Sequence, residues 1–289
     1  MIMKKKIMLK KIILTTCLIL FSFNLTAEEN IYKMVFVPAS EKGDESDYTN
    51  LIAITQKLTG LNIDTIKVTD YNAAVEAMRA GRAHLAWFGG KTYVKAAEIA
   101  NAEAFAAGVR PGEKNAGYYT YFVVKKDSVL KEFRDVKNKV LSLNTIGSTS
   151  GDLIPQVELN KINLSIKNKD HFNKVFYAGS HDACLLSVLN NQSDVCGMSS
   201  RNFEARLEDG TFKKEDVRII HKSNRVPPPP LAYSKMIPIE DRDKIKKAVL
   251  EAHKHGQIGG YGGKMSHYME VKDSDYNVLR EVIELLNKS

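Results

Sequence analysis

The stretch KVFYAGSHDACLLSVLNNQSDVCGM, residues 174–198, carries the clearest indication of fold in this chain of 289 residues. Its first four residues predict a short strand, and Gly179-Ser180 predicts a turn. The apolar stretch 183–189 predicts a helix, and a second apolar run at 195–198 predicts another strand. A strand, a helix and a strand in this order are typical of α/β folds.

The same order of elements occurs earlier in the chain. Residues 63–68 predict a strand, and Asp70 is a suitable N-cap for the helix that follows. In that helix the apolar residues recur at three- and four-residue spacing, and Gly81 ends it before a short apolar strand at 84–88. Two regions with one pattern predict two similar lobes rather than one large sheet.

The lobes are expected to be joined by two connections. The run 117–125 is typical of a strand that leaves the first lobe, and 217–221 of the strand that leads back. We therefore expect a signal segment at 1–27, a first lobe made of 28–124 and 222–289, and a second lobe at 125–221. Two connections suit hinge closure around a ligand.

The first 27 residues have the three parts of a secretory signal. They hold five of the chain's 42 basic residues and none of its 34 acidic ones, then an apolar run at 12–25, and Ala27 precedes two glutamates. We expect cleavage near Ala27 and an exported, periplasmic protein; an uncleaved anchor or a lipoprotein signal at Cys17 are the alternatives. Because the signal carries most of the net charge of +8, the sequence does not favour nucleic-acid binding.

Three cysteines are too few for a disulfide scaffold. Without the signal, Cys184 and Cys196 are left, and we expect two unpaired thiols in the core, because buried cysteine behaves as a small hydrophobe. An oxidising compartment would also permit a bond between them. The sequence has no Cys-x-x-Cys motif and no His/Cys cluster at metal-ligand spacing, so neither a metal nor a cofactor is expected.

Gly147-Ser148-Thr149-Ser150-Gly151 is the strongest local signal for a site, because it lies between a predicted strand and a predicted helix. Free backbone N–H groups at a helix N-terminus, together with adjacent hydroxyls, can bind an anion. The segment matches neither a Walker loop nor a hydrolase nucleophile elbow. An ordinary Ser/Thr helix cap is the alternative interpretation.

Two other polar segments follow predicted strands. The first, residues 179–182, places His181 near the start of a helix, where it could donate to an oxyanion or serve only as a capping residue. The second, residues 87–93, presents Thr92 and Tyr93 beside two glycines, with aromatic side chains able to wall a site. Strand ends of this kind meet at a crevice in open α/β sheets, so we expect all three segments to line one ligand site.

Four motifs follow one another along the chain: Tyr71–Ala77 with Ala80-Gly81, Ala86–Gly89 with Thr92–Val94, Gly147–Gly151, and Gly179–Ala183. In their order and spacing they resemble the hallmarks of the phosphate, phosphite and phosphonate group of periplasmic solute-binding proteins, which serve ABC importers. The resemblance extends from about Val35 to about His253. It implies an α/β, two-lobed type II periplasmic binding protein fold, with a hinge and a ligand cleft between the lobes.

The resemblance also implies the ligand-binding residues. The positions that bind the oxyanion correspond to Ser148, Thr149, Ser150, Tyr93 and His181, with Thr92 beside them. Asp182 corresponds to an acid that can meet the amine of an aminophosphonate, and Tyr48 is the candidate for an aromatic residue from the first loop. The implied function is a high-affinity binding component of an importer for a phosphorus oxyanion. We expect a monomer whose partner is an ABC permease in the inner membrane.

One departure from the family pattern bears on the ligand. Aminophosphonate binders carry an acid shortly after the strand at 195–198, but the first carboxylate here is Glu204, which favours phosphite or a short alkylphosphonate. Three alternatives stay open: a sensor that signals to a membrane histidine kinase, a ligand such as a sulfonate or a metal chelate, and an enzyme. An enzyme would need a nucleophile–base pair made of Ser148 or Cys184 with His181.

Overall fold

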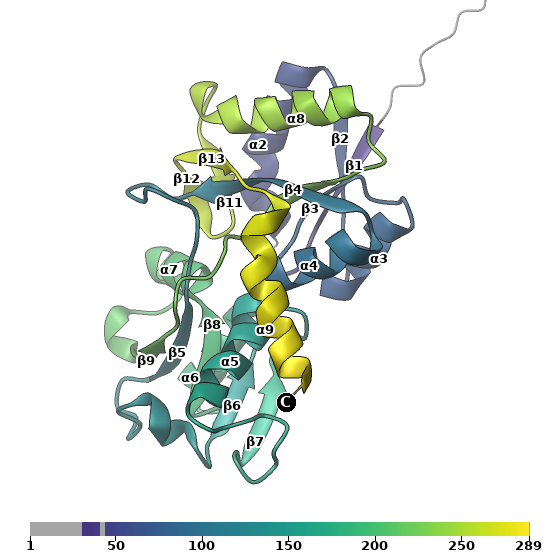
Figure 1. Ribbon diagram of the computed structural model, residues 1–289. Coiled ribbons are helices and arrows are strands. Elements are labelled where there is room, and N and C mark those ends of the chain that lie inside the picture. Colours follow the sequence, from purple (N-terminus) through teal and green to yellow (C-terminus); the bar gives the residue numbers. More distant parts are fainter. Residues whose placement is uncertain (1–30, 41–43, 289) are drawn as a thin grey trace, which may run out of the picture. The chain divides into compact units, whose positions relative to one another are not determined.

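The computed structural model describes residues 31–40 and 44–288, so the predicted signal segment at 1–27 lies outside them. The described chain contains two mixed β-sheets with helices packed around them, as Figure 1 shows, and this confirms the predicted α/β class. Both sheets belong to a single compact unit. None of the described helices is long and apolar enough to cross a membrane.

The first sheet has the strand order β2-β1-β3-β10-β4-β13. Its strands are β1 (Ile31–Phe36), β2 (Asn62–Ile66), β3 (Leu85–Trp87), β4 (Ala102–Val109), β10 (Leu231–Ser234) and β13 (His267–Glu270). Strand β1 pairs in parallel with β2 and β3, whereas β10 lies antiparallel between β3 and β4. The late strand β10 therefore sits among strands from the first half of the chain.

The second sheet has the strand order β7-β6-β8-β5-β9. Its strands are β5 (Thr120–Lys125), β6 (Val140–Leu143), β7 (Lys174–Tyr177), β8 (Val195–Ser199) and β9 (Val217–Lys222). Strand β6 pairs in parallel with β7 and β8, and β5 lies antiparallel between β8 and β9. The topology of the first sheet is repeated here, as the repeated sequence pattern predicts.

The helices that pack around the two sheets are α2 (Asp44–Thr59), α3 (Tyr71–Arg79), α4 (Gly90–Ile99), α5 (Ile154–Lys161), α6 (His181–Leu189), α7 (Ser200–Glu208), α8 (Ile239–Glu251) and α9 (Asn277–Lys288). Helices α2 to α7 follow successive strands of the two sheets, α8 follows β10, and α9 follows β13. A small hairpin, β11 (Ile258–Gly260) and β12 (Gly263–Met265), precedes β13. Helix α9, yellow in Figure 1, contacts both α4 and α5 and so touches the helices of both sheets.

Helix α3 illustrates how local sequence sets an element. Asp70 accepts a hydrogen bond from the backbone N–H of Ala73 at 2.9 Å, which confirms the predicted N-cap. The predicted apolar positions Ala74, Val75 and Met78 are all buried against the first sheet's core. The cap and the apolar stripe together hold the loop before α3 in place.

The crossing between the sheets lies earlier than predicted. The expected lobe boundary after residue 124 would place most of β5 in the first lobe, but β5 pairs only with β8 and β9 in the second sheet. The chain therefore crosses between Val109 and Thr120. The return falls between Lys222 and Leu231, next to the predicted position. The division of the chain into two separate domains stays a prediction.

The second sheet has a separate apolar core on each face. On β5, Phe122 and Val124 point into one core and Val123 points into the other, as the alternation of side chains along a strand requires. The core that contains Val123 also holds Cys184 and Cys196. The two cysteines are therefore buried between α6 and β8.

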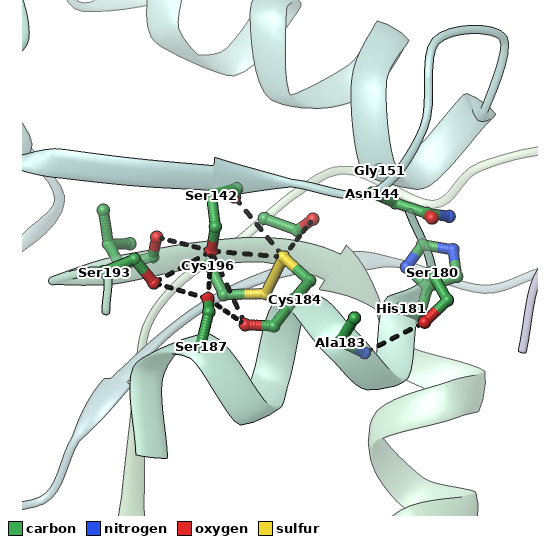
Figure 2. The surroundings of a disulfide bond; sticks show 12 residues. Ser142, Asn144, Gly151, Ser180, His181, Ala183, Cys184, Ser187, Ser193 and Cys196 are labelled. Carbon is green, nitrogen blue, oxygen red and sulfur yellow. Dashed lines mark hydrogen bonds between the residues drawn. A yellow bond between two sulfur atoms is a disulfide. The ribbon is translucent and has the colours of Figure 1, made fainter. Parts of the chain in front are cut away.

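Cys184 and Cys196 form a disulfide bond, so the expectation of two unpaired thiols is wrong (Figure 2). Packing of α6 on β8 brings their Cα atoms to 5.7 Å, which is within the range that a disulfide spans. Buried serine hydroxyls surround the bond, and Ser187 Oγ lies 2.9 Å from Ser142 Oγ. The bond ties the helix that begins at His181 to its neighbouring strand.

We expect reduction of this disulfide to lower the free energy of unfolding by roughly 3 kcal/mol, because a cross-link of this sequence separation restricts the unfolded chain. Urea unfolding of the oxidised and reduced protein measures the difference. A Cys184→Ala/Cys196→Ala variant serves as the control, since reductant should not change its unfolding midpoint. Equal midpoints for the oxidised and reduced wild-type protein would contradict the expectation.

Candidate functional site

The Gly147–Gly151 segment forms a buried turn at the end of β6. Ser148 is the N-cap, and its Oγ accepts a hydrogen bond from the N–H of Gly151 at 3.1 Å. Residues Thr149–Leu153 form one π-helical turn, and α5 continues directly from it. Ser148, Thr149 and Ser150 are each only 2% exposed. Three hydroxyls are thus concentrated at the N-terminal end of a helix, inside the protein.

Gly151 makes the close packing of this turn possible. A Cβ atom on Gly151 would overlap Asn144 and would lie 2.9 Å from Cε1 of His181. Figure 2 shows Asn144 beside the imidazole of His181, at the start of α6. The absence of a side chain at Gly151 therefore lets the hydroxyl turn approach the histidine.

His181 is the first residue of α6, and Ser180 caps this helix by accepting from the N–H of Ala183 at 3.0 Å (Figure 2). The imidazole is 1% exposed, and burial lowers its pKa from 6.5 to about 3, so it is neutral near pH 7. Its Nδ1 accepts from the N–H of Ser199 at 3.2 Å. This bond assigns the proton to Nε2, which lies 3.5 Å from Ser150 Oγ and can donate to an anion.

Two threonines connect the hydroxyl turn to the first sheet. Thr149 Oγ1 accepts from the backbone N–H of Lys91 at 2.9 Å, and Thr92 Oγ1 donates to the carbonyl of Gly147 at 3.0 Å. Both contacts join the N-terminus of α4 to the turn after β6. These two segments therefore meet at Thr92 and Thr149, and that they line one ligand site stays a prediction.

An ion pair with a buried carboxylate reinforces the same junction. Lys91 Nζ lies 2.6 Å from Oδ2 of Asp152, whose side chain is 2% exposed. Asp152 also accepts from the N–H of Gly147 and from the hydroxyl of Tyr177. These donors compensate the negative charge of the buried carboxylate. The Lys91–Asp152 pair therefore fixes the turn relative to α4.

Tyr118 belongs to the cluster although the sequence did not single it out. Burial raises its pKa to about 12, whereas hydrogen bonding to the side chains of Ser150 and Thr149 acts in the opposite direction. The tyrosine lies two residues before β5, in the segment that crosses between the sheets. Its phenol is neutral and adds another hydroxyl donor to the site.

An aromatic group adjoins this hydroxyl. The ring centroid of Tyr261 lies 6.2 Å from that of Tyr118 and 4.8 Å from that of Trp87. Tyr48 lies 5.9 Å from Trp87, and its hydroxyl accepts from the N–H of Tyr261 at 3.1 Å. Trp87, Tyr48 and Tyr261 thus form one group of packed rings, called the aromatic wall below, and its contact with a ligand stays a prediction. Tyr261, from the β11–β12 turn, is a further residue that sequence reasoning missed.

Tyr93 lies apart from the hydroxyl cluster, and its contact with a ligand stays a prediction. Its hydroxyl donates to Oδ1 of Asp273 at 2.7 Å and accepts from the N–H of Ala104 at 3.1 Å. Its ring packs against Tyr276. The side chain therefore points into the interface of α4 with β4 and the short 3-10 helix Asp273–Tyr276, and not toward the turn after β6.

Asp182 lies beside His181 and is 5% exposed. Its Oδ2 is 3.8 Å from Nη1 of Arg206, which also pairs with Asp209. A nearby guanidinium compensates the negative charge of this carboxylate, so the structure supplies a cation of its own at this position. Contact between Asp182 and a ligand amine stays a prediction.

The arrangement is suited to binding an anion through neutral donors. Thr149, Ser150, Tyr118 and Nε2 of His181 provide O–H and N–H groups, and two helices begin at the cluster. Cys184 is unavailable as a thiol nucleophile because it is bonded to Cys196. Within residues 31–40 and 44–288, no three His, Cys, Asp or Glu side chains are grouped so that they could hold a metal ion.

Comparison with known families gives one match that covers most of the chain. Residues 34–276 match the model of a family described as "ABC transporter, phosphonate, periplasmic substrate-binding protein". The phosphonates-binding periplasmic protein of Escherichia coli is 27% identical over 73% of this chain and 66% of its own length. The phosphate-import protein PhnD of Mycolicibacterium smegmatis is 24% identical over 86% of this chain and 84% of its own length.

Solved structures share the fold. A binding protein component of a phosphonate ABC transporter from Pseudomonas aeruginosa superposes with a TM-score of 0.78 at 21% identity, covering 90% of this chain and 87% of that one. A Prochlorococcus marinus protein in complex with methylphosphonate has a TM-score of 0.77 at 21% identity, covering 90% of this chain and 99% of that one. The implied two-lobed type II periplasmic binding fold is thereby confirmed.

Proposed function

The chain belongs to the family of phosphonate ABC transporter periplasmic substrate-binding proteins, and we propose that its buried hydroxyl cluster binds a phosphorus oxyanion. As a member of this family it is the periplasmic solute-binding component of an importer. The proposed ligand is phosphite or a phosphonate with a small substituent that carries no amine. The residues proposed to bind it are Ser148, Thr149, Ser150, Tyr118 and His181.

The observation that supports this proposal is the convergence of neutral donors in a buried site. Each hydroxyl, and the Nε2–H of His181, can donate to an oxygen of an oxyanion. Donors of this kind discriminate among ligands by shape and protonation, since a buried group left without a partner is costly. The named relatives that bind phosphonates or import phosphate are consistent with this ligand class.

Isothermal titration calorimetry of the purified protein tests the ligand class. The panel holds phosphite, methylphosphonate, 2-aminoethylphosphonate, phosphate, sulfate and taurine. We expect phosphite or methylphosphonate to bind more tightly than sulfate and taurine. If the folded protein binds none of the phosphorus compounds, the proposed ligand class is wrong, although the family assignment stands.

We expect Tyr118→Phe to weaken binding of the preferred phosphorus ligand roughly tenfold, because it removes one hydroxyl donor and keeps the ring. Tyr121→Phe is the matched control. Tyr121 lies on β5 with its hydroxyl 3.3 Å from Glu204, and the same substitution there should leave the affinity unchanged. Equal affinities for wild type and Tyr118→Phe would remove Tyr118 from the site.

We further propose that the protein acts as a monomer and without catalysis. The disulfide removes the Cys184 thiol from any nucleophile–base pair with His181. A neutral histidine with a pKa near 3 is also a weak general base at neutral pH. The names of the relatives favour a role in import over one in signalling to a sensor kinase.

A further inference from the structure

Two buried hydrogen-bond donors near the aromatic wall are left without a partner within the described part of the chain. They are Nε1 of Trp87 and Nη1 of Arg201, and both residues are at most 4% exposed. An unsatisfied buried donor is unfavourable unless a ligand or a water accepts from it. These two donors therefore indicate where an acceptor would be stabilised.

Arg201 is held in place by its other terminal nitrogen. Its Nη2 lies 2.7 Å from Glu113 Oε2 and 2.5 Å from the carbonyl of Gly117, both in the segment that crosses between the sheets. Its side chain is 5% exposed, whereas that of Glu113 is 36% exposed. Solvent screens the negative charge of Glu113 more than the positive charge of Arg201. The electrostatic potential on the buried side of the pair therefore stays positive.

Arg201 lines a small cavity that adjoins the aromatic wall. Tyr48, Gly117, Tyr261, Pro228 and Pro229 line it as well. Tyr261 contacts the rings of Trp87 and Tyr118, and the charge of Arg201 acts on the hydroxyl of Tyr118. Tyr261 thus connects the cavity that Arg201 lines with the tyrosine that also contacts the hydroxyl cluster.

We propose that Arg201, together with Trp87, forms a second acceptor-binding subsite beside the oxyanion cluster, and that the ligand is a phosphonate whose substituent carries a carboxylate. This inference rests on the proposed function, because the phosphonate group itself would occupy the hydroxyl cluster. It narrows the proposed substituent of the phosphonate from any small group without an amine to a negatively charged group that accepts hydrogen bonds.

The charge of the subsite distinguishes it from one for an amine. An ammonium group has only donors, so it would leave Nη1 of Arg201 and Nε1 of Trp87 without acceptors and would face a like charge. A carboxylate has only acceptors and carries the opposite charge, so its oxygens can accept from these donors. The subsite therefore discriminates against an ammonium substituent by repulsion and favours a carboxylate substituent by attraction.

The test compares phosphonoacetate with 2-aminoethylphosphonate, two ligands of similar length with opposite charges on the substituent, by calorimetry at neutral pH. Methylphosphonate is the reference without a charged substituent. We expect phosphonoacetate to bind at least roughly tenfold more tightly than 2-aminoethylphosphonate. Equal affinities, or a preference for the amine, would overturn the subsite.

Three variants separate binding from structural support. Arg201→Gln should weaken phosphonoacetate roughly tenfold and change methylphosphonate binding little, whereas equal weakening of all ligands would mean that Arg201 only supports the fold. Glu113→Gln removes the counter-charge and should strengthen phosphonoacetate binding, an effect that a structural role does not predict. Trp87→Phe removes one donor, keeps an aromatic ring, and should reduce the preference for phosphonoacetate.

Methylphosphonate separates the failure of this inference from that of the proposed function. If methylphosphonate binds but phosphonoacetate binds no more tightly than 2-aminoethylphosphonate, the proposed subsite is wrong and the proposed oxyanion site stands. If no phosphorus ligand binds to the folded wild-type protein, both are wrong. If Arg201→Gln does not fold, the opposite effects expected for Glu113→Gln and Trp87→Phe still decide between a binding and a structural role.

Discussion

Acidification below pH 6.5 is expected to destabilise the protein steeply because His181 is buried in its neutral form. Burial lowers the pKa of its imidazole to about 3 in the folded state, while the unfolded chain titrates near 6.5. The unfolded state therefore binds a proton more readily than the folded state. The contribution of neutral His181 to the free energy of unfolding is complete above pH 6.5 and is lost as the pH falls toward 3. The expected loss is about 1.4 kcal/mol for each pH unit in that window.

Urea unfolding at a series of pH values from 7.5 to 4 measures this effect. His181→Asn keeps an acceptor for the N–H of Ser199 but cannot titrate, so its unfolding free energy should depend less on pH. His84→Asn is the comparison variant. Burial and Lys33 also lower the pKa of His84, but its imidazole is less buried than that of His181. If wild type and His181→Asn lose stability in parallel, the histidine is not the titrating group.

Gly151→Ala is expected to damage both stability and ligand binding. The new Cβ would overlap Asn144 and press on His181 and Ser148, which would force the hydroxyl turn away from the imidazole. Overpacking of this kind costs about 3 kcal/mol. Displacement of two donors should weaken phosphonate binding roughly a hundredfold.

Gly210→Ala serves as the control for substitution of a glycine. Gly210 has a positive φ of 75°, but a Cβ atom there would meet no other atom within 4 Å, so only a backbone penalty of about 1 kcal/mol is expected. Thermal unfolding measures the stability of both variants, and calorimetry measures their affinity for the preferred phosphorus ligand. Binding by Gly151→Ala at wild-type affinity would show that the close approach of the turn to His181 is not needed.

Local sequence signals predicted those elements whose stabilising contacts are close in the chain. The cap Asp70 was recognisable because it accepts from a backbone N–H only three residues away, and the predicted turn at Ser180 has the same local contact with Ala183. Strand β4 and the β11–β12 hairpin were missed. Strand β4 is rich in alanine, which has low strand propensity, and it is stabilised by pairing with β10 and β13 from much later in the chain. The repeated glycines around Tyr261 were the one local signal for the hairpin turn.

The sequence by itself determined the α/β class, the repeated order of elements and the hydroxyl turn with its histidine. Only the tertiary structure decided which side chains surround them. Tyr93 bonds to Asp273, 180 positions away, whereas Tyr118 reaches Ser150 because the chain crosses between sheets just before β5. Packing of α6 on β8 likewise decided that the cysteines pair. Such partners depend on the pairing of distant strands, and periodicity within one segment contains no information about it.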